Sequence, residues 1–272
     1  MVTIPQSLIL GVVEGVTEFL PVSSSGHLIL VRELLHINDQ GGLAFDAILQ
    51  LGTILAAFVY FWADIWKLIK TGWKIITRGS KSVAATERNL LLAVILGTIP
   101  AVIAGLLLQK TMETAFRSAT LVAITLLLGS ALFVYAEKKS RQTHADASTH
   151  DGFWVGLYQC LALVPGISRS GATISGGLLQ GLTRETAVRF SFLLSLPIIA
   201  GSGLLELHKI LKNGATDIAP APLVIGFITS FVLGYICIRW LLGYLKHHTL
   251  MAFVWYRCAL AVVVLLVVAF YR

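Results

Sequence analysis

Long apolar stretches, each close to the length of a membrane-crossing helix, follow one another along most of the chain, with short polar stretches between them. A helix of about 20 apolar residues matches the thickness of a bilayer. The pattern therefore predicts an all-α, polytopic membrane protein with one integral membrane domain over residues 1–272. The expected crossings lie at about 45–62, 91–108, 119–136, 190–207, 221–240 and 251–270.

Composition supports this class. Hydrophobic residues make up 56% of the 272 positions and charged residues 13%, about half the charged share of a typical soluble domain. The formal net charge of +7 is spread over the loops between apolar stretches, which argues against a nucleic-acid partner and fits the basic loops of a membrane protein. Membrane lipids are therefore the expected surroundings.

Two segments far apart in the chain share one polar pattern inside apolar surroundings. Residues 11–27 read GVVEGVTEFLPVSSSGH, and residues 156–173 read GLYQCLALVPGISRSGAT. They align at a constant offset (156 − 11 = 145), at which Ser23 corresponds to Ser168. The similarity continues downstream, where Gly97 and its surroundings recur at Gly226. The chain thus contains an internal duplication with two motif segments.

Each repeat, about 1–140 and about 152–272, holds one motif segment followed by three apolar stretches. The motif segments are poor crossing helices. If Glu costs as much as Asp, each central carboxylate costs about 2.5–3.5 kcal/mol to insert, and Pro21 with the following serines breaks a helix. We therefore expect two re-entrant helical hairpins. Three crossings per repeat would then make the repeats inverted and bring both hairpins together near the middle of the membrane.

The densest basic stretches, at about 67–88, 138–141 and 239–246, fall on one side of the membrane under this count. That side should be cytoplasmic. Both chain ends and the opening of the site would then face outside. The segment at about 63–90 reads as a basic loop that the second repeat lacks.

The first motif segment carries candidate metal ligands and a candidate acid–base group. Glu14 and Glu18 are four residues apart, so on a helix both carboxylates share one face, where Mg²⁺ or Ca²⁺ would relieve their repulsion. The alternative is a pair of protonated or hydrogen-bonded buried glutamates without a metal. Ser24 and His27 are three apart and offer a hydroxyl with a base that activates it or a water. Such a Ser-x-x-His pair also arises by chance.

The second motif segment is typical of an anion site. The guanidinium fork of Arg169 suits a pair of phosphoryl oxygens, and nearby hydroxyls and a loosened backbone add donors, especially if a helix begins there. The alternative is an arginine paired with a carboxylate of the first segment, and both states are compatible if substrate replaces that partner. The candidate substrate-binding residues are Arg169, Ser168, Ser170, Thr173, Gly171, Ser23 and Ser25.

Carboxylates, a hydroxyl with an imidazole, and an arginine together indicate phosphoryl transfer to water. The chain resembles the bacterial undecaprenyl-diphosphate phosphatase family associated with bacitracin resistance. The resemblance rests on the E-x-x-x-E motif at 14–18, on PVSSSGH at 21–27 and on PGISRSGAT at 165–173, and it extends over essentially the whole chain.

The resemblance implies hydrolysis of undecaprenyl diphosphate to undecaprenyl phosphate and phosphate, with a divalent cation (Mg²⁺ or Ca²⁺) required. The reaction recycles the lipid carrier for peptidoglycan in the bacterial inner membrane, at a site open to the periplasmic side. Carried over position by position, the resemblance marks Glu14, Glu18, Ser24, His27, Arg169, Ser168, Ser170 and Thr173. The expected catalytic residues among them are His27, Ser24, Arg169 and Glu18. The identity of the nucleophile stays open among Ser24, His27 and water, and the protein is compatible with a monomer or a homodimer.

Two other classes of membrane protein share some of these features. A second class of membrane lipid phosphatases shares Ser-Gly-His and Ser-Arg elements, but it places a histidine six residues after the arginine, where this chain has Ser175. A polyprenyl-phosphate transporter or flippase would share the inverted-repeat architecture. The two motif segments differ in their chemistry, however, and a division of labour favours a catalyst over a symmetric carrier.

Overall fold

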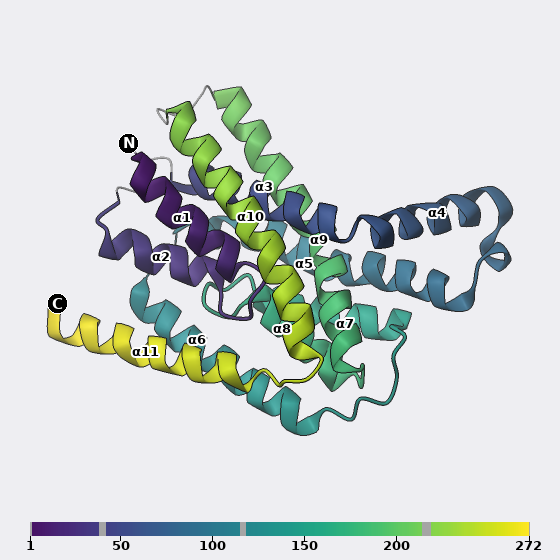
Figure 1. Cartoon of the computed structure of the whole chain (residues 1–272). Coiled ribbons are helices and arrows are strands. Elements are labelled where there is room, and N and C mark those ends of the chain that lie inside the picture. Colours follow the sequence, from purple (N-terminus) through teal and green to yellow (C-terminus); the bar gives the residue numbers. More distant parts are fainter. Residues whose placement is uncertain (1, 38–41, 115–117, 214–218, 272) are drawn as a thin grey trace.

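The computed structural model describes residues 2–37, 42–114, 118–213 and 219–271 (Figure 1). Every regular element in these residues is a helix, as the apolar pattern predicts. In chain order the elements are α1 (Ile4–Thr17), α2 (Ser24–Leu34), α3 (Gly42–Tyr60), α4 (Trp62–Arg78), the 3-10 helix η1 (Ser80–Ser82), α5 (Ala85–Thr114), α6 (Ala119–Lys139), α7 (Thr149–Leu161), α8 (Arg169–Leu179), α9 (Arg184–Asn213), α10 (Pro220–Leu245) and α11 (Met251–Tyr271).

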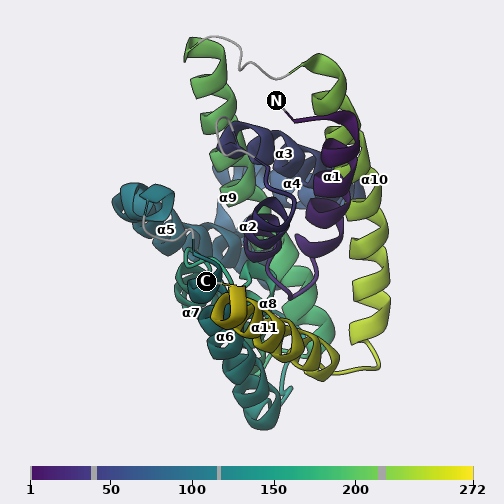
Figure 2. The ribbon, with the colours of Figure 1, turned by 90° about the vertical axis from the view of Figure 1, so that its left-hand side faces the viewer.

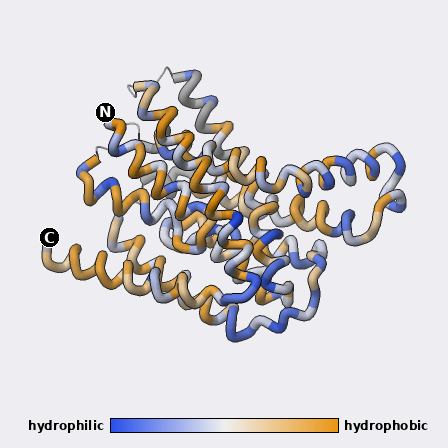
Figure 3. Tube along the Cα trace, viewed as in Figure 1, coloured by the Kyte–Doolittle hydropathy of each residue, from blue (hydrophilic) through white to orange (hydrophobic). Residues whose placement is uncertain are grey.

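Within the described ranges, five helices are long and apolar enough to cross a bilayer, judged by length and composition: α5, α6, α9, α10 and α11. The axes of α3 and α4 meet at an angle of 74°, and this bent pair would supply a sixth crossing. Apolar residues cover most of α10 and α11, whereas hydrophilic residues gather in the segments that join helices (Figure 3). These features confirm a multi-pass helical membrane protein.

The prediction of a basic loop at about 63–90 is wrong, because α4 occupies most of that segment. Its apolar residues Trp66, Ile69, Trp73 and Ile76 recur at helical spacing and form one face. The lysines border this face, with the Lys70 ammonium 5.4 Å from the centroid of the Trp66 ring. That apolar face is exposed in the structure. A helix with one apolar face and basic residues beside it is typical of the membrane interface.

The first helix of each half packs against a helix of the other half, and the two contacts lie at equivalent positions. α1 lies against α10, and α7 lies against α5. A Cβ atom added at Gly11 would lie 2.8 Å from the carbonyl oxygen of Gly226, and one added at Gly156 would lie 2.4 Å from that of Gly97. These are the glycines that correspond in the duplicated sequence, so the first helix of each half depends on the other half for its packing surface.

Each motif segment consists of two short helices joined by a turn, as the helix-breaking residues predict. α1 and α2 contain 14 and 11 residues, and α7 and α8 contain 13 and 11. At about 1.5 Å per residue such helices reach about 17–21 Å, which is short of the roughly 30 Å hydrocarbon layer. Figures 1 and 2 place both chain ends on the same side of the molecule, and Figure 1 places the segment between α6 and α7 at the opposite end.

Candidate functional site

The turns that precede α2 and α8 share one conformation. Ser23 caps α2 with a φ of 76°, and Ser168 caps α8 with a φ of 75°. The hydroxyl oxygen of Ser23 accepts the Gly26 N–H at 3.4 Å, and that of Ser168 accepts the Gly171 N–H at 3.2 Å. A positive φ outside glycine costs about 1–3 kcal/mol and collects at functional sites. The duplicated serines therefore keep the same strained geometry twice.

The two turns also bind each other directly. The Gly166 N–H donates to the Ser23 hydroxyl oxygen at 3.0 Å. In the other direction the Ser170 hydroxyl donates to the carbonyl of Leu20 at 3.2 Å. These contacts join segments about 145 residues apart, so the first residues of α2 and α8 open onto one shared site.

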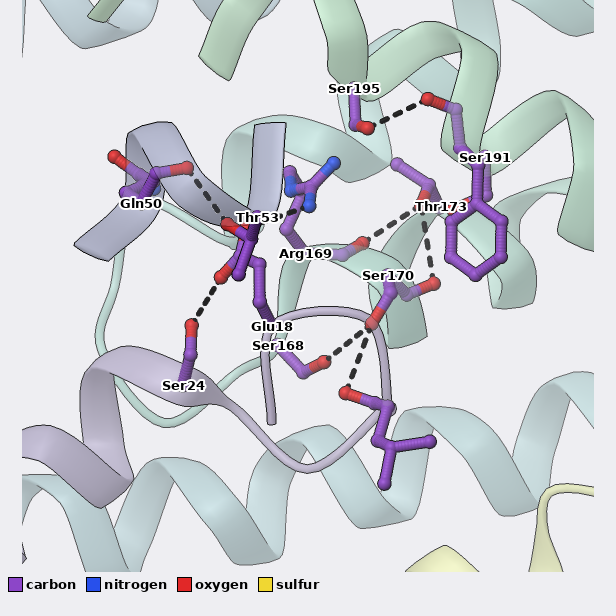
Figure 4. A network of polar contacts seen from close by, with 12 residues as sticks. Glu18, Ser24, Gln50, Thr53, Ser168, Arg169, Ser170, Thr173, Ser191 and Ser195 are labelled. Carbon is purple, nitrogen blue, oxygen red and sulfur yellow. Dashed lines mark hydrogen bonds and ion pairs between the residues drawn. The ribbon is translucent and has the colours of Figure 1, made fainter. Parts of the chain in front are cut away.

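Glu18 lies at the centre of this site (Figure 4). Its Oε1 accepts a hydrogen bond from Arg169 Nη2 at 2.9 Å, and its Oε2 accepts one from the Ser24 hydroxyl at 2.5 Å. The side chain of Glu18 is 5% exposed and that of Arg169 is 14% exposed. The structure thus brings three of the four predicted catalytic residues together, and it shows the Arg169–carboxylate pair considered above.

Arg169 keeps one donor free. Its Nη1 is buried and has no hydrogen-bond partner among the described residues. A buried donor without a partner costs about 1–3 kcal/mol, and a phosphoryl oxygen is a suitable acceptor for a guanidinium. The arginine can therefore hold Glu18 with one nitrogen and an anionic ligand with the other.

The remaining predicted binding residues fall into two groups. The Ser168 and Ser170 hydroxyls lie 3.2 Å apart, and those of Ser23 and Ser25 lie 3.4 Å apart, all at the two turns. Two others serve packing in this structure, because the Thr173 hydroxyl donates to the Arg169 carbonyl at 2.8 Å and a Cβ at Gly171 would lie 1.9 Å from the ring of Phe133.

His27 is not bonded to Ser24. Its Nδ1 lies 2.7 Å from the Ser23 carbonyl oxygen, and its Nε2 lies 2.7 Å from the Tyr256 hydroxyl. The Ser24 hydroxyl turns instead to Glu18. The structure therefore makes Glu18 the proton acceptor nearest to Ser24. Tyr256 was not anticipated from the sequence, because it lies in the last apolar stretch.

Glu14 and Glu18 occupy successive turns, since the Glu18 N–H donates to the Glu14 carbonyl at 2.9 Å. Glu14 is 3% exposed, and the charges that act on it are those of Glu18, Asp46 and Arg169. The described residues contain no group of three or more His, Cys, Asp or Glu side chains that could hold a metal. Mg²⁺ commonly uses one or two carboxylates and takes its other ligands from water and substrate phosphates. The pair fits such a shared Mg²⁺ better than a Ca²⁺ with six to eight ligands.

Fold and site together define a class: a multi-pass helical membrane protein in which two duplicated motif segments build one buried site of carboxylate, hydroxyl and guanidinium groups. The family model "Bacitracin resistance protein BacA" matches residues 7–263, and the chain belongs to that family.

Similar proteins include an undecaprenyl-diphosphatase of Geotalea daltonii, 44% identical over 97% of this chain and 98% of the relative. Another, from Renibacterium salmoninarum, is 40% identical over 97% and 96% of the two chains. Undecaprenyl-diphosphatase 1 of Paraburkholderia xenovorans is 42% identical over 96% and 94%.

Proposed function

We propose that the protein is a membrane phosphatase that hydrolyses undecaprenyl diphosphate to undecaprenyl phosphate and inorganic phosphate. The relatives named above match over nearly their full length. The observation that carries the proposal is the Glu18 carboxylate, bound by Ser24 on one oxygen and by Arg169 on the other, next to a free Arg169 donor. Returning the lipid carrier to cell-wall synthesis would confer bacitracin resistance, because the drug sequesters the diphosphate.

The terminal phosphate is bound by groups of both turns. Arg169 Nη1 donates to one phosphoryl oxygen. The Ser168, Ser170 and Ser25 hydroxyls, which are bonded within and between the two turns in this structure, add donors when they turn from these partners to the phosphate. The amino ends of α2 and α8, whose partial positive charge favours anions, begin at Ser24 and Arg169. With the phosphate bound in this position, the prenyl chain extends from the site into the apolar surroundings.

Ser24 is the proposed nucleophile. Its oxygen forms a bond to the terminal phosphorus, the bond from that phosphorus to the bridging oxygen breaks, and the hydroxyl proton passes to Glu18 Oε2. Undecaprenyl phosphate leaves with the electron pair, and Arg169 offsets the charge that develops. The oxygen of a water then forms a bond to the phosphorus, the bond from phosphorus to the Ser24 oxygen breaks, and Glu18 returns its proton to that oxygen. The water proton passes to His27 Nε2, which for this step exchanges its contact with the Tyr256 hydroxyl for the water. Mg²⁺ held by Glu14 and Glu18 would supply further positive charge to the phosphoryl oxygens.

The decisive measurement is phosphate release from a C55 diphosphate by the purified protein, with and without a chelator. Release that stops on chelation and returns with Mg²⁺ is the expected result. A transporter or flippase would instead move a polyprenyl phosphate across proteoliposomes without releasing phosphate. Mass measurement of the detergent-solubilised protein tests whether the active form is a monomer or a homodimer.

The proposed topology places both motif hairpins as re-entrant elements of two inverted repeats in the bacterial inner membrane, with the site open to the periplasm. It is supported by the short motif helices and by the chain ends lying on one side. In a background without native cysteines, Thr3→Cys and Thr114→Cys should react with an impermeant thiol reagent added outside. Ser80→Cys and Ala145→Cys should react only after the cytoplasmic side is opened. Outside reaction at 114 but not at 3 would contradict the re-entrant first hairpin.

A further inference from the structure

Arg257 is a fully buried arginine in the first third of the apolar helix α11, and its exposed fraction is 0%. Its Nη1 donates to the Pro21 carbonyl at 3.3 Å, and its Nη2 donates to the Gly166 carbonyl at 2.9 Å. These two carbonyls occupy corresponding positions in the duplicated segments (166 − 21 = 145). One guanidinium therefore reaches both turns of the site at the same point of each.

Three residues of α6 also contact the Arg257 guanidinium. Its Nε donates to the Ser130 hydroxyl at 3.1 Å, its Nη2 also donates to the Leu126 carbonyl at 3.0 Å, and it lies over the Phe133 ring at 4.7 Å from the centroid. Its hydrogen-bond acceptors among the described residues are all neutral oxygens. A charged group kept at membrane depth without a carboxylate in contact is costly and by default marks a functional position.

The preceding residue, Tyr256, binds the other side of the first turn. A carbonyl oxygen only accepts, so His27 Nδ1 carries the proton that it shares with the Ser23 carbonyl. In neutral His27 the Tyr256 hydroxyl then donates to Nε2 at 2.7 Å, and in protonated His27 it accepts from Nε2. The two rings stack with centroids 5.7 Å apart and planes 7° apart. Tyr256 thus fixes the imidazole in both of its protonation states.

These contacts form one continuous chain of hydrogen bonds. Tyr256 binds His27, His27 binds the Ser23 carbonyl, the Ser23 hydroxyl binds the Gly166 N–H, and the Gly166 carbonyl binds Arg257. The two ends of this chain of hydrogen bonds, Tyr256 and Arg257, are consecutive residues of α11. By contrast, the neighbouring side chain of Trp255 is 71% exposed and faces away from these hydrogen bonds.

We propose that Tyr256 and Arg257 are positioning residues of the phosphatase site. Arg257 sets the separation of the Ser24 turn from the Arg169 turn, and Tyr256 sets the orientation of the His27 ring. The inference rests on the proposed phosphatase function. Neither residue touches the substrate, so both act on the rate of the chemical step and leave substrate binding nearly unchanged.

The test compares kcat and KM for phosphate release from a C55 diphosphate in purified variants, each normalised to folded protein. Tyr256→Phe removes one oxygen and should lower kcat about tenfold, the scale of one hydrogen bond, with KM within about twofold of wild type. In a His27→Ala background the same substitution should have no further effect. Trp255→Phe is the matched control and should match wild type.

For Arg257, displacement of the turns by about 1 Å should cost about a hundredfold in kcat. Arg257→Lys, which keeps a donor for one carbonyl, should retain more activity than Arg257→Met, while Arg239→Lys on the exposed side of α10 should match wild type. If the Arg257 variants do not fold, the comparison of Tyr256→Phe with wild type tests the positioning role. An active wild type with unchanged Tyr256→Phe, or full additivity with His27→Ala, overturns the positioning role alone. An inactive wild type overturns the proposed function and this role with it.

Discussion

The turn after α1 and the turn after α7 each place a serine at a φ near 75° and cap the next helix through the same hydroxyl contact. The serines at 23 and 25 recur at 168 and 170, but the acidic, basic and imidazole side chains around this shared backbone occur in one turn only. Glu18 corresponds to Leu163, Ser24 to Arg169 and His27 to Ala172. The first turn supplies proton acceptors and the hydroxyl, and the second supplies the cation.

This difference shows how a duplicated fold becomes a single catalytic site. Each turn alone lacks half of the groups that phosphoryl transfer needs. The contact between Glu18 and Arg169 joins the two halves at one ion pair, and the helix crossings at paired glycines bring the turns to that distance. Substitutions that make one turn resemble the other should therefore remove activity without removing the fold.

Glu18→Gln should have the largest effect. The amide keeps the shape of the carboxylate, but its NH₂ group must face either Ser24 or Arg169, both of which are donors here. It also cannot accept a proton, so phosphate release should fall by about a thousandfold. Glu33→Gln, at an exposed glutamate of α2, is the control. More than a tenth of wild-type turnover in Glu18→Gln would remove Glu18 from the chemistry.

Arg169→Lys should come next, with a loss of about a hundredfold. A single ammonium keeps the charge but cannot present the fork that binds Glu18 through Nη2 and leaves Nη1 for the phosphate. Phosphate release is measured beside Arg141→Lys, which changes an exposed arginine. Equal turnover of the two variants would show that only the charge matters at position 169.

Much of the fold could be predicted because the bilayer constrains it. Apolar stretches of crossing length became helices, and the break at Pro21 appeared where proline and serines interrupt the first segment. The correspondence of Gly97 with Gly226 indicated the duplication, and the structure places these glycines at two equivalent helix crossings. The segment at 63–90 was misread, since its lysines suggested a loop while its tryptophans and isoleucines already repeated at helical spacing.

The site was predictable only as far as the motifs reach. The pairing of Arg169 with a carboxylate was among the alternatives, but the partner of Ser24 was not, because spacing within α2 does not reveal which side chain lies across the turn. Tyr256 and Arg257 were missed since their partners come from distant segments. One signal was present in the sequence: an arginine inside the last apolar stretch.

Glu14→Gln sharpens the comparison, because it gives position 14 the side chain that its counterpart Gln159 already has. Turnover at saturating Mg²⁺ should fall about tenfold. The Mg²⁺ concentration for half-maximal activity should rise by at least that factor, since even changes beside a metal ligand cost 10–100-fold in affinity. The measurement is a Mg²⁺ titration of phosphate release after chelation. An unchanged titration curve would leave Glu14 as a buried glutamate without a metal role.

Gln159→Met should have the smallest effect. The Gln159 Nε2 donates to the Gly97 carbonyl at a long 3.5 Å, and its buried Oε1 has no partner. Methionine has a similar volume and leaves no unsatisfied oxygen, so turnover should stay within about twofold and the unfolding temperature should not fall. Phosphate release and thermal unfolding are measured together. A loss of turnover above tenfold with unchanged unfolding would place Gln159 in the chemistry. The second motif segment would then contribute a second group to the reaction besides Arg169.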